Sequence, residues 1–128
     1  MGLRNESKTL FIPLVGKALM SKENIIIKDS KAEEIVSMEG LNKLKQSKWL
    51  SMYMSLRAVI IDELTNKYLI SHKDTTVIHL GCGLDSRALR VSDNYSMWYD
   101  IDYEEVITLR KKYYKENEKY KMISSSIS

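Results

Sequence analysis

The sequence predicts an α/β fold in which a helical segment, residues 1–72, precedes the first strands of a parallel sheet in residues 73–128. Two observations lead to this prediction. Up to about residue 72 the apolar residues recur with helical spacing, and beyond it short runs rich in β-branched and aromatic residues alternate with a helical run. Strand, helix, strand, helix, strand at this spacing is typical of right-handed crossovers between parallel strands.

Composition limits the class of protein. A chain of 128 residues with 44% hydrophobic residues can form one domain around one core. Its 20 basic and 17 acidic residues give a net charge of +3 without a basic stripe, so no nucleic-acid partner is expected. The sequence shows neither a signal-peptide pattern nor an apolar run of roughly 20 residues, so no membrane association is expected. The single cysteine, Cys82, lacks metal-ligand spacing around it, which favours a reducing cytoplasm and no metal site.

Three helices are expected in the N-terminal segment. The first has an apolar stripe made of Leu10, Leu14, Val15, Ala18 and Leu19. Pro13 lies inside this stripe and is expected to end or kink the helix. In "SKAE" Ser30 and Glu33 match a capping box, which predicts a short helix ending near Gly40. A longer helix is expected from Ser47, with an apolar face made of Leu50, Met54, Ala58, Ile61, Leu64 and Tyr68.

The second half of the chain carries the expected strands. They are "TTVIHL" (75–80), "SMWYDID" (96–102) and "YKMISSS" (120–126). Between the last two, "YEEVITLRKKYYKENE" (103–118) has a helical pattern, and its tyrosines are expected to wrap an amphipathic helix.

The turn after the first strand predicts a binding site. In "TVIHLGCGLDSRALRV" the strand ends in Gly81 and Gly83, which allow a sharp bend and a close approach of a ligand to the backbone. Asp102 ends the next strand about 20 residues later, where an acidic residue commonly accepts hydrogen bonds from ribose hydroxyls. Together these residues indicate a nucleoside-containing cofactor.

Missing features narrow the type of cofactor. A dinucleotide fingerprint needs a third glycine at position 86, which is Ser86, and the Gly-Lys-Ser or Gly-Lys-Thr of a phosphate loop is absent. Asp85 would be a poor neighbour for a phosphate. A cationic nucleoside without phosphate, such as S-adenosylmethionine, fits these facts better than NAD or ATP.

These segments resemble the leucine carboxyl methyltransferase family, including its bacterial O-methyltransferase branch. The resemblance lies in "VIHLGCGLDSRALRV" followed by "WYDIDYEEVITLRKKYY", and upstream in "PLVGKALMS", "IIIKDSKAEEIV" and "MSLRAVIIDE". Ser86 replaces the usual Thr, and Tyr103-Glu104 replaces a common Leu-Pro. The family's fold implies that the strands form the first half, about three strands, of a Rossmann-like class I methyltransferase sheet.

The resemblance also implies roles for individual residues. Gly81 would lie against the methionine part of S-adenosylmethionine, with Gly83 shaping the same turn. Asp102 would hold the ribose hydroxyls, Arg57 the cofactor carboxylate, and Lys17 a second basic contact. The implied reaction is methyl transfer to a carboxylate or hydroxyl oxygen of a small molecule or a protein, and no catalytic side chain is assigned.

Structural interpretations of the same residues stay open. In these interpretations the two glycines only form a tight turn, and Asp102 caps a helix starting near Glu104. Arg57 and Lys17 are then solvated side chains.

Four other residues of this region are expected to be structural. Asp85 and Arg87 are expected to pair with one another or brace the turn, and His79 is expected to be a hydrogen-bonded core histidine. Cys82 is expected to supply a small side chain only, because nothing around it activates a thiol.

Members of the family continue through several more strands, which leads to two hypotheses for this chain. In the first it is the cofactor-binding N-terminal part of an O-methyltransferase, truncated and with negligible activity alone. In the second it is a non-catalytic fragment that acts as a self-associating or binding module. Without a fourth strand the first strand would have an unpaired edge and bare apolar faces, so a homodimer through residues 76–80 is expected. The alternative is that the N-terminal helices fold back over this edge within one chain.

Overall fold

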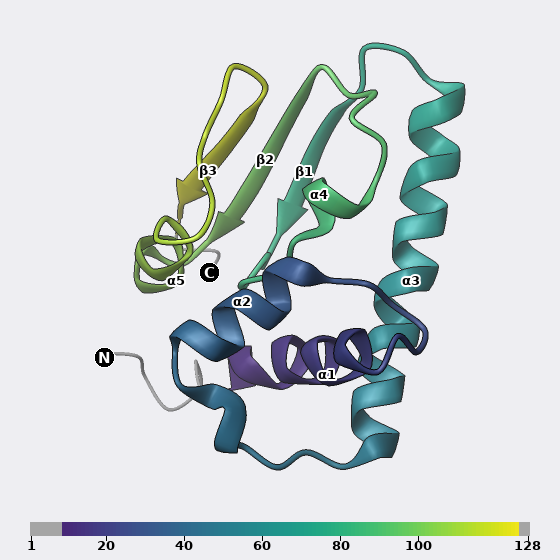
Figure 1. Cartoon of the computed structure of the whole chain (residues 1–128). Helices are drawn as coiled ribbons and strands as arrows, with labels where there is room; N and C mark the ends of the chain where they lie inside the picture. Colours follow the sequence, from purple (N-terminus) through teal and green to yellow (C-terminus); the bar gives the residue numbers. More distant parts are fainter. Residues whose placement is uncertain (1–8, 126–128) are drawn as a thin grey trace.

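The computed structural model describes residues 9–125, and it has the predicted α/β fold, with N-terminal helices followed by a three-stranded parallel sheet (Figure 1). The first helices are α1 (Phe11–Lys22), α2 (Ser30–Met38), the short 3₁₀ helix η2 (Leu41–Lys43) and α3 (Lys48–Ser71). They are followed by β1 (Thr76–Leu80), α4 (Arg87–Arg90), β2 (Met97–Asp102), α5 (Glu104–Arg110) and β3 (Tyr120–Ser124). Within residues 9–125 no helix is long and apolar enough to cross a membrane.

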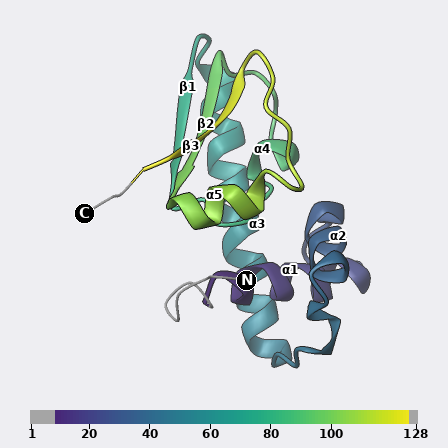
Figure 2. The same ribbon diagram turned by 90° about the vertical axis from the view of Figure 1, so that its left-hand side faces the viewer.

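The strand order is β1-β2-β3, so β2 is central and β1 is an edge strand among the described residues. The helix α4 lies to one side of the sheet (Figure 2). The side chains of β2 alternate in burial, and Trp98 and Asp100 are fully buried. They share one face, because Trp98 packs in the core with Ala88 and Asp100 is linked through His79 to Arg87. On the opposite face Ile78 and Leu80 of β1 are 59% and 60% exposed. The predicted unpaired edge is therefore confirmed among the described residues, but only one face of β1 is bare, since Val77 and His79 on the other face are partly buried.

The two short helices at the start of the chain differ in detail from the predictions. Pro13 neither ends nor kinks α1, because it is the third residue of that helix, and N–H groups of the first turn have no partner within a helix. The cap of α2 is Asp29 and not Ser30: its carboxylate accepts a hydrogen bond from the backbone N–H of Ala32 at 3.0 Å. Gly40, in the left-handed conformation, follows this helix as expected.

The predicted face of α3 is partly wrong. The helix begins after Ser47 as predicted, but Leu64 and Tyr68 are 62% and 54% exposed. Its buried residues are instead Ser51, Ser55, Ala58, Asp62 and Leu69. The reason is close packing against α1: a Cβ added to Gly16 would lie 3.1 Å from the Cα of Ser51, and the Ser55 hydroxyl bonds the Gly16 carbonyl at 3.4 Å. Small residues allow this approach, and large apolar ones would prevent it.

The predicted helix over residues 103–118 is shorter than expected, since α5 ends at Arg110. Beyond it the chain turns so that Tyr114 is buried and its hydroxyl bonds the carbonyl of Leu84 at 2.8 Å. This long-range contact overrides the helical pattern of the segment. The third strand then forms within the predicted run.

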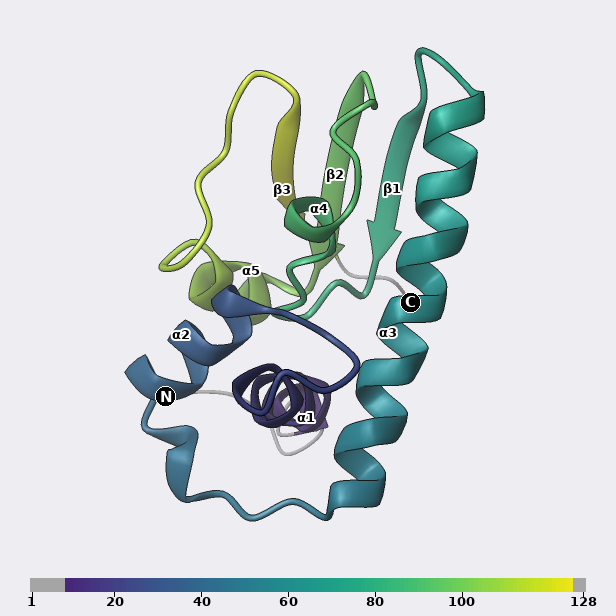
Figure 3. The ribbon, with the colours of Figure 1, turned by 45° about the vertical axis from the view of Figure 1, so that its right-hand side comes forward.

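One core joins the helical and sheet segments. Its buried residues include Leu14 and Val15 of α1, Ile35 of α2 and Trp98 of β2. The carboxyl ends of β1 and β2 consequently lie next to α1 and the middle of α3 (Figure 3).

Candidate functional site

A pocket of about 430 Å³, here called the glycine-turn pocket, lies where β1 and β2 end beside α1 and α3. All five residues that the sequence singled out line it: Lys17, Arg57, Gly81, Gly83 and Asp102. They come from two helices, the turn after β1 and the end of β2. Residues up to 85 positions apart in the sequence (from Lys17 to Asp102) therefore share one hollow.

The two glycines have different surroundings. Both have positive φ, +65° at Gly81 and +55° at Gly83, a conformation that other residues rarely adopt. A Cβ on Gly81 would meet no atom within 4 Å, whereas a Cβ on Gly83 would lie 2.8 Å from Cδ1 of Leu10. Gly81 thus borders open space in the pocket, and Gly83 packs against the start of α1.

Asp102 fixes the glycine turn from the neighbouring strand. One carboxylate oxygen accepts a hydrogen bond from the backbone N–H of Gly83 at 2.8 Å, and the other accepts from the N–H of Tyr103 at 2.7 Å. The helix-cap interpretation is wrong, because Tyr103 is the cap residue of α5 and no side chain caps it. Each carboxylate oxygen still has a lone pair for a further donor.

The two basic residues of the pocket differ in their partners. Lys17 is buried, and its Nζ lies 2.6 Å from Oδ1 of Asp85. Arg57 is exposed at the pocket wall, and its guanidinium has no ion-pair or hydrogen-bond partner among residues 9–125. Of the two, Arg57 is the cation that is free to bind a ligand anion.

Asp85 is the centre of a cluster of ion pairs in the wall of the pocket. Besides Lys17 it contacts Arg87 at 3.3 Å, as predicted, and Arg90 at 2.7 Å. Burial would raise the pKa of Asp85, but Lys17, Arg90 and Arg87 together hold it well below its usual range. The Asp-Ser-Arg part of the motif is therefore a buried brace for the turn.

The sequence reasoning missed Asp62 of α3, which joins this cluster. Its carboxylate accepts hydrogen bonds from Arg87 Nε at 2.9 Å and from Arg90 Nε at 2.7 Å. A signal for it exists in the sequence, because Ser51, Ser55, Ala58 and Asp62 recur at helical spacing and mark a narrow polar stripe.

His79 is hydrogen-bonded, as predicted, but it is only partly buried and lines the glycine-turn pocket. Its Nε2 lies 3.1 Å from Nη1 of Arg87, and its Nδ1 lies 3.0 Å from Oδ1 of Asp100. Because arginine can only donate, Nε2 is the acceptor and Nδ1 carries the proton given to Asp100. Both ring nitrogens are thus engaged by protein groups.

Cys82 is buried in the turn, and burial raises its pKa to about 12. A thiol with this pKa is almost entirely protonated at neutral pH, so it is no nucleophile. The expectation of a merely structural cysteine is confirmed.

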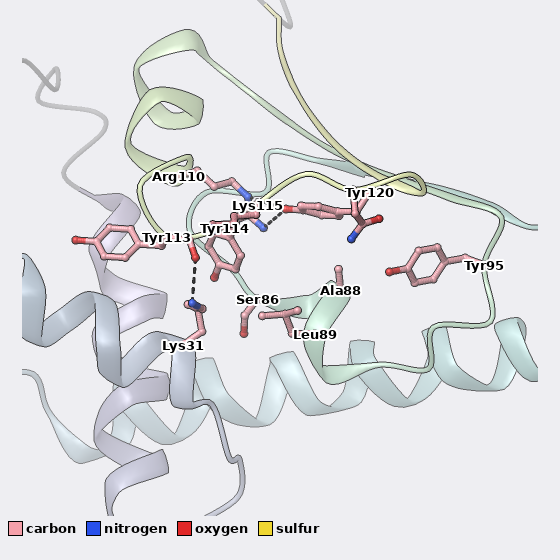
Figure 4. Close-up of a pocket in the computed structure, with 11 residues that line it drawn as sticks. Lys31, Ser86, Ala88, Leu89, Tyr95, Arg110, Tyr113, Tyr114, Lys115 and Tyr120 are labelled. Carbon is pink, nitrogen blue, oxygen red and sulfur yellow. Dashed lines mark hydrogen bonds between the residues drawn. The ribbon is translucent and has the colours of Figure 1, made fainter.

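A second hollow of about 360 Å³, the tyrosine pocket, lies next to α4 (Figure 4). Tyr95, Tyr113, Tyr114 and Tyr120 line it together with Arg110. The prediction that the tyrosines of residues 113–120 wrap a helix is wrong, because they follow the end of α5. Arg110 donates to the carbonyl of Gly83 at 3.1 Å, so this pocket supports the back of the glycine turn.

Arg110 was also missed in the sequence. It is fully buried, and its guanidinium donates to the carboxylate of Asp100 and to the hydroxyl of Tyr120. Burial would raise the pKa of Asp100, but the hydrogen bond from His79 and the charge of Arg110 lower it overall. The buried charges of β2 and α5 are therefore paired with each other.

Comparisons with known proteins agree with this arrangement. Residues 4–121 match the model of the leucine carboxyl methyltransferase family. The chain belongs to this family. It is 33% identical over 126 residues to the tetracenomycin polyketide synthesis O-methyltransferase TcmP of Streptomyces glaucescens, covering 94% of this chain and 46% of that protein. It is 28% identical over 123 residues to the S-adenosyl-L-methionine-dependent methyltransferase dpfgK of Gibberella zeae, covering 86% of this chain and 41% of that protein.

This family member spans less than half the length of the two relatives. Membership implies S-adenosylmethionine as the cofactor, and the glycine-turn pocket fits such a ligand in three respects. Gly81 leaves free the space that a Cβ would fill, and Asp102 has acceptor capacity for hydroxyl donors. Arg57 is a cation without a partner among residues 9–125, so it can pair with a carboxylate. The volume lies within the roughly 300–1,000 Å³ of ordinary small-molecule sites.

Proposed function

We propose that this chain is the cofactor-binding part of an S-adenosylmethionine-dependent O-methyltransferase. The main observation behind the proposal is that all five residues predicted from the sequence to bind the cofactor line one pocket of suitable size. The O-methyltransferase relative TcmP supports an oxygen atom as the acceptor, in a carboxylate or a hydroxyl of a small molecule or a protein.

Each residue of the pocket has a proposed role. Arg57 pairs with the cofactor's carboxylate, and Asp102 accepts hydrogen bonds from the ribose hydroxyls while it holds Gly83. Gly81 allows the ligand to lie against the backbone, and Lys17 gives a second basic contact with the donors that Asp85 leaves free.

The bound cofactor supplies an electrophilic methyl group on a sulfonium. The chain's contribution is to hold and orient this ligand, since methyl transfer depends on placement more than on acid–base chemistry. No proton acceptor is assigned to the pocket, because His79 and Asp85 are both engaged in hydrogen bonds or ion pairs. We expect the chain alone to turn over little substrate, and we propose the cytoplasm as its location because Cys82 is a free thiol.

Calorimetric titration with S-adenosylhomocysteine tests this function. We expect binding in the micromolar range that is lost in Asp102→Ala. Asp93→Ala removes an exposed carboxylate outside the pocket and serves as the control, so it should bind like the parent chain. Absence of binding by the parent chain would refute the proposed function.

A second candidate function, a self-associating module, rests on the bare face and edge of β1. Two apolar residues, Ile78 and Leu80, lie more than half exposed on a strand with an unpaired edge. The simplest way to bury these residues and pair this edge is a two-fold dimer in which residues 76–80 of two chains contact each other. Light scattering at low micromolar concentration should then show a dimer that Ile78→Lys disrupts and Met38→Lys, an exposed apolar control on α2, does not. A monodisperse parent monomer would exclude the dimer.

A further inference from the structure

Asp62 is a buried carboxylate that joins two elements of the chain. It accepts from both Nε and Nη2 of Arg90, at 2.7 Å and 3.1 Å, and from Nε of Arg87 at 2.9 Å. Arg90 therefore binds the Asp62 carboxylate with two parallel hydrogen bonds, the strongest form of arginine–carboxylate contact. These bonds run from the middle of α3 to α4, immediately after the glycine turn.

The attachment of α3 to the sheet segment combines the buried side chain of Leu69 with polar contacts. Its small residues pack against α1, as the contact between Gly16 and Ser55 shows. Towards the sheet segment, Asn66 accepts from the backbone N–H of Ser92 at 2.7 Å, and Leu69 offers its carbonyl to Asn94 at 2.8 Å. Of these contacts, the Asp62 bridge carries charge and lies next to the glycine-turn pocket, because Arg87 lines that pocket.

Arg57 lies on the same helix, five residues before Asp62, which is about 7.5 Å along the axis. Its guanidinium has no partner in residues 9–125 that would hold it over the pocket. The position of Arg57 therefore depends on where α3 as a whole is fixed. Ser55 bonds this helix to α1, and Asp62 supplies the nearest ion pairs to the segment after the glycine turn.

Asp62 also determines the balance of charge in the wall of the pocket. With it, the cations Lys17, Arg87 and Arg90 face the two carboxylates of Asp62 and Asp85. Without it, both arginines would be left to Asp85 and to Asp29, which Arg90 also contacts. Arg87, which lines the pocket, would lose its contact with α3 and keep those with Asp85 and His79.

We propose that Asp62 is a positioning residue: by holding Arg87 and Arg90 it fixes α3 against the glycine turn and so places Arg57 where a ligand carboxylate is bound. The inference rests on the proposed function, and it adds that recognition of the amino-acid part of the cofactor depends on a residue that does not line the pocket.

The test compares two ligands that differ in this part. S-adenosylhomocysteine has the amino-acid carboxylate, and methylthioadenosine lacks it. In calorimetric titrations Asp62→Asn should weaken binding of S-adenosylhomocysteine about tenfold, as the loss of one charge-assisted contact does, and leave methylthioadenosine within about twofold. Arg57→Ala should show the same pattern, and the double variant should be no weaker than Arg57→Ala alone, because both changes remove one interaction.

Glu63→Gln, which neutralises the adjacent exposed carboxylate on the same helix, is the matched control and should leave both affinities unchanged. Should Asp62→Asn not fold, Asp62→Glu keeps the charge and displaces the carboxylate by one methylene, with the same selective loss expected at about threefold.

Three results are distinguishable. A parent chain that binds neither ligand would refute the proposed function itself. A parent chain that binds both, with Asp62 variants that bind like it, would overturn the positioning role. Equal losses for both ligands would overturn it too, since they would mean that Asp62 merely keeps the pocket folded.

Discussion

The two pockets of this chain have similar volumes, about 430 Å³ and 360 Å³, but opposite states of their polar groups. In the tyrosine pocket the buried groups of Arg110, Tyr114 and Tyr120 all bond to protein atoms. In the glycine-turn pocket Gly81 borders empty space, and Arg57 has no partner in residues 9–125. The difference teaches that volume alone does not indicate a binding site: one hollow supports the turn, and the other has groups left to receive a ligand.

The largest expected effect comes from breaking the buried cluster beside the tyrosine pocket. Arg110→Met leaves Asp100 buried without its cation, which should lower the free energy of unfolding by about 3–5 kcal/mol. Urea unfolding measures this loss. Lys115→Met, an exposed cation lining the same pocket, is the control and should change stability by less than about 0.5 kcal/mol. Equal effects of the two changes would mean that the cluster is not what supports the fold.

The same cluster predicts a dependence of stability on acid. The pKa of Asp100 is lowered in the folded chain, so its stabilising contribution is complete above the ordinary value of 3.8 and is lost as the pH falls through the folded pKa. Asp85, with a pKa well below its usual range, contributes with the same sign. Thermal unfolding between pH 6 and about 2 should show a melting temperature that is level first and then falls below about pH 4. A melting temperature that rises on acidification would contradict the paired state of both carboxylates.

A smaller effect is expected from alanine substitutions at two glycines that have the same backbone conformation. Gly81 and Gly40 both have positive φ, and a Cβ on either would meet no atom within 4 Å. Alanine at each position should cost about 1 kcal/mol of stability through backbone strain alone. Gly81→Ala, however, places a methyl group in the space of the glycine-turn pocket and should also weaken S-adenosylhomocysteine binding about tenfold or more. If Gly40→Ala weakened binding equally, strain and not the filled space would be the cause.

The smallest expected effect concerns the contact between the two pockets. Tyr114→Phe removes the hydrogen bond to the Leu84 carbonyl and should cost about 1 kcal/mol, the net worth of such a bond. Because this carbonyl belongs to the segment that separates the pockets, affinity for S-adenosylhomocysteine should change by no more than about twofold. Tyr95→Phe, which alters another tyrosine of the same lining, is the control in unfolding and titration measurements.

The site was predictable where its signals are local. Gly81 and Gly83 end a strand, and Asp102 ends the next one, so a parallel arrangement brings them to the same edge whatever the details of the packing. The parallel direction of the three strands follows from the same spacing of elements.

Partners that depend on the assembled fold were not predictable. Arg110 belongs to the basic run "LRKKYYK", where an arginine looks solvated, and its burial follows only from the placement of α5 over Asp100 and Tyr120. In the same way the early end of α5 depends on the contact of Tyr114 with Leu84, and the buried face of α3 depends on its neighbour α1. Local sequence patterns do not show which residues far apart in the chain will contact each other.

The unreactive thiol of Cys82 has a practical consequence for measurements on this chain. It is the single cysteine, it is buried, and its pKa of about 12 keeps it protonated under ordinary labelling conditions. A cysteine introduced at an exposed position, such as Tyr53→Cys on α3, would be the site that a maleimide dye modifies, with no need to replace the native residue. The position of α3 can therefore be followed by fluorescence during ligand titration on an otherwise unaltered protein.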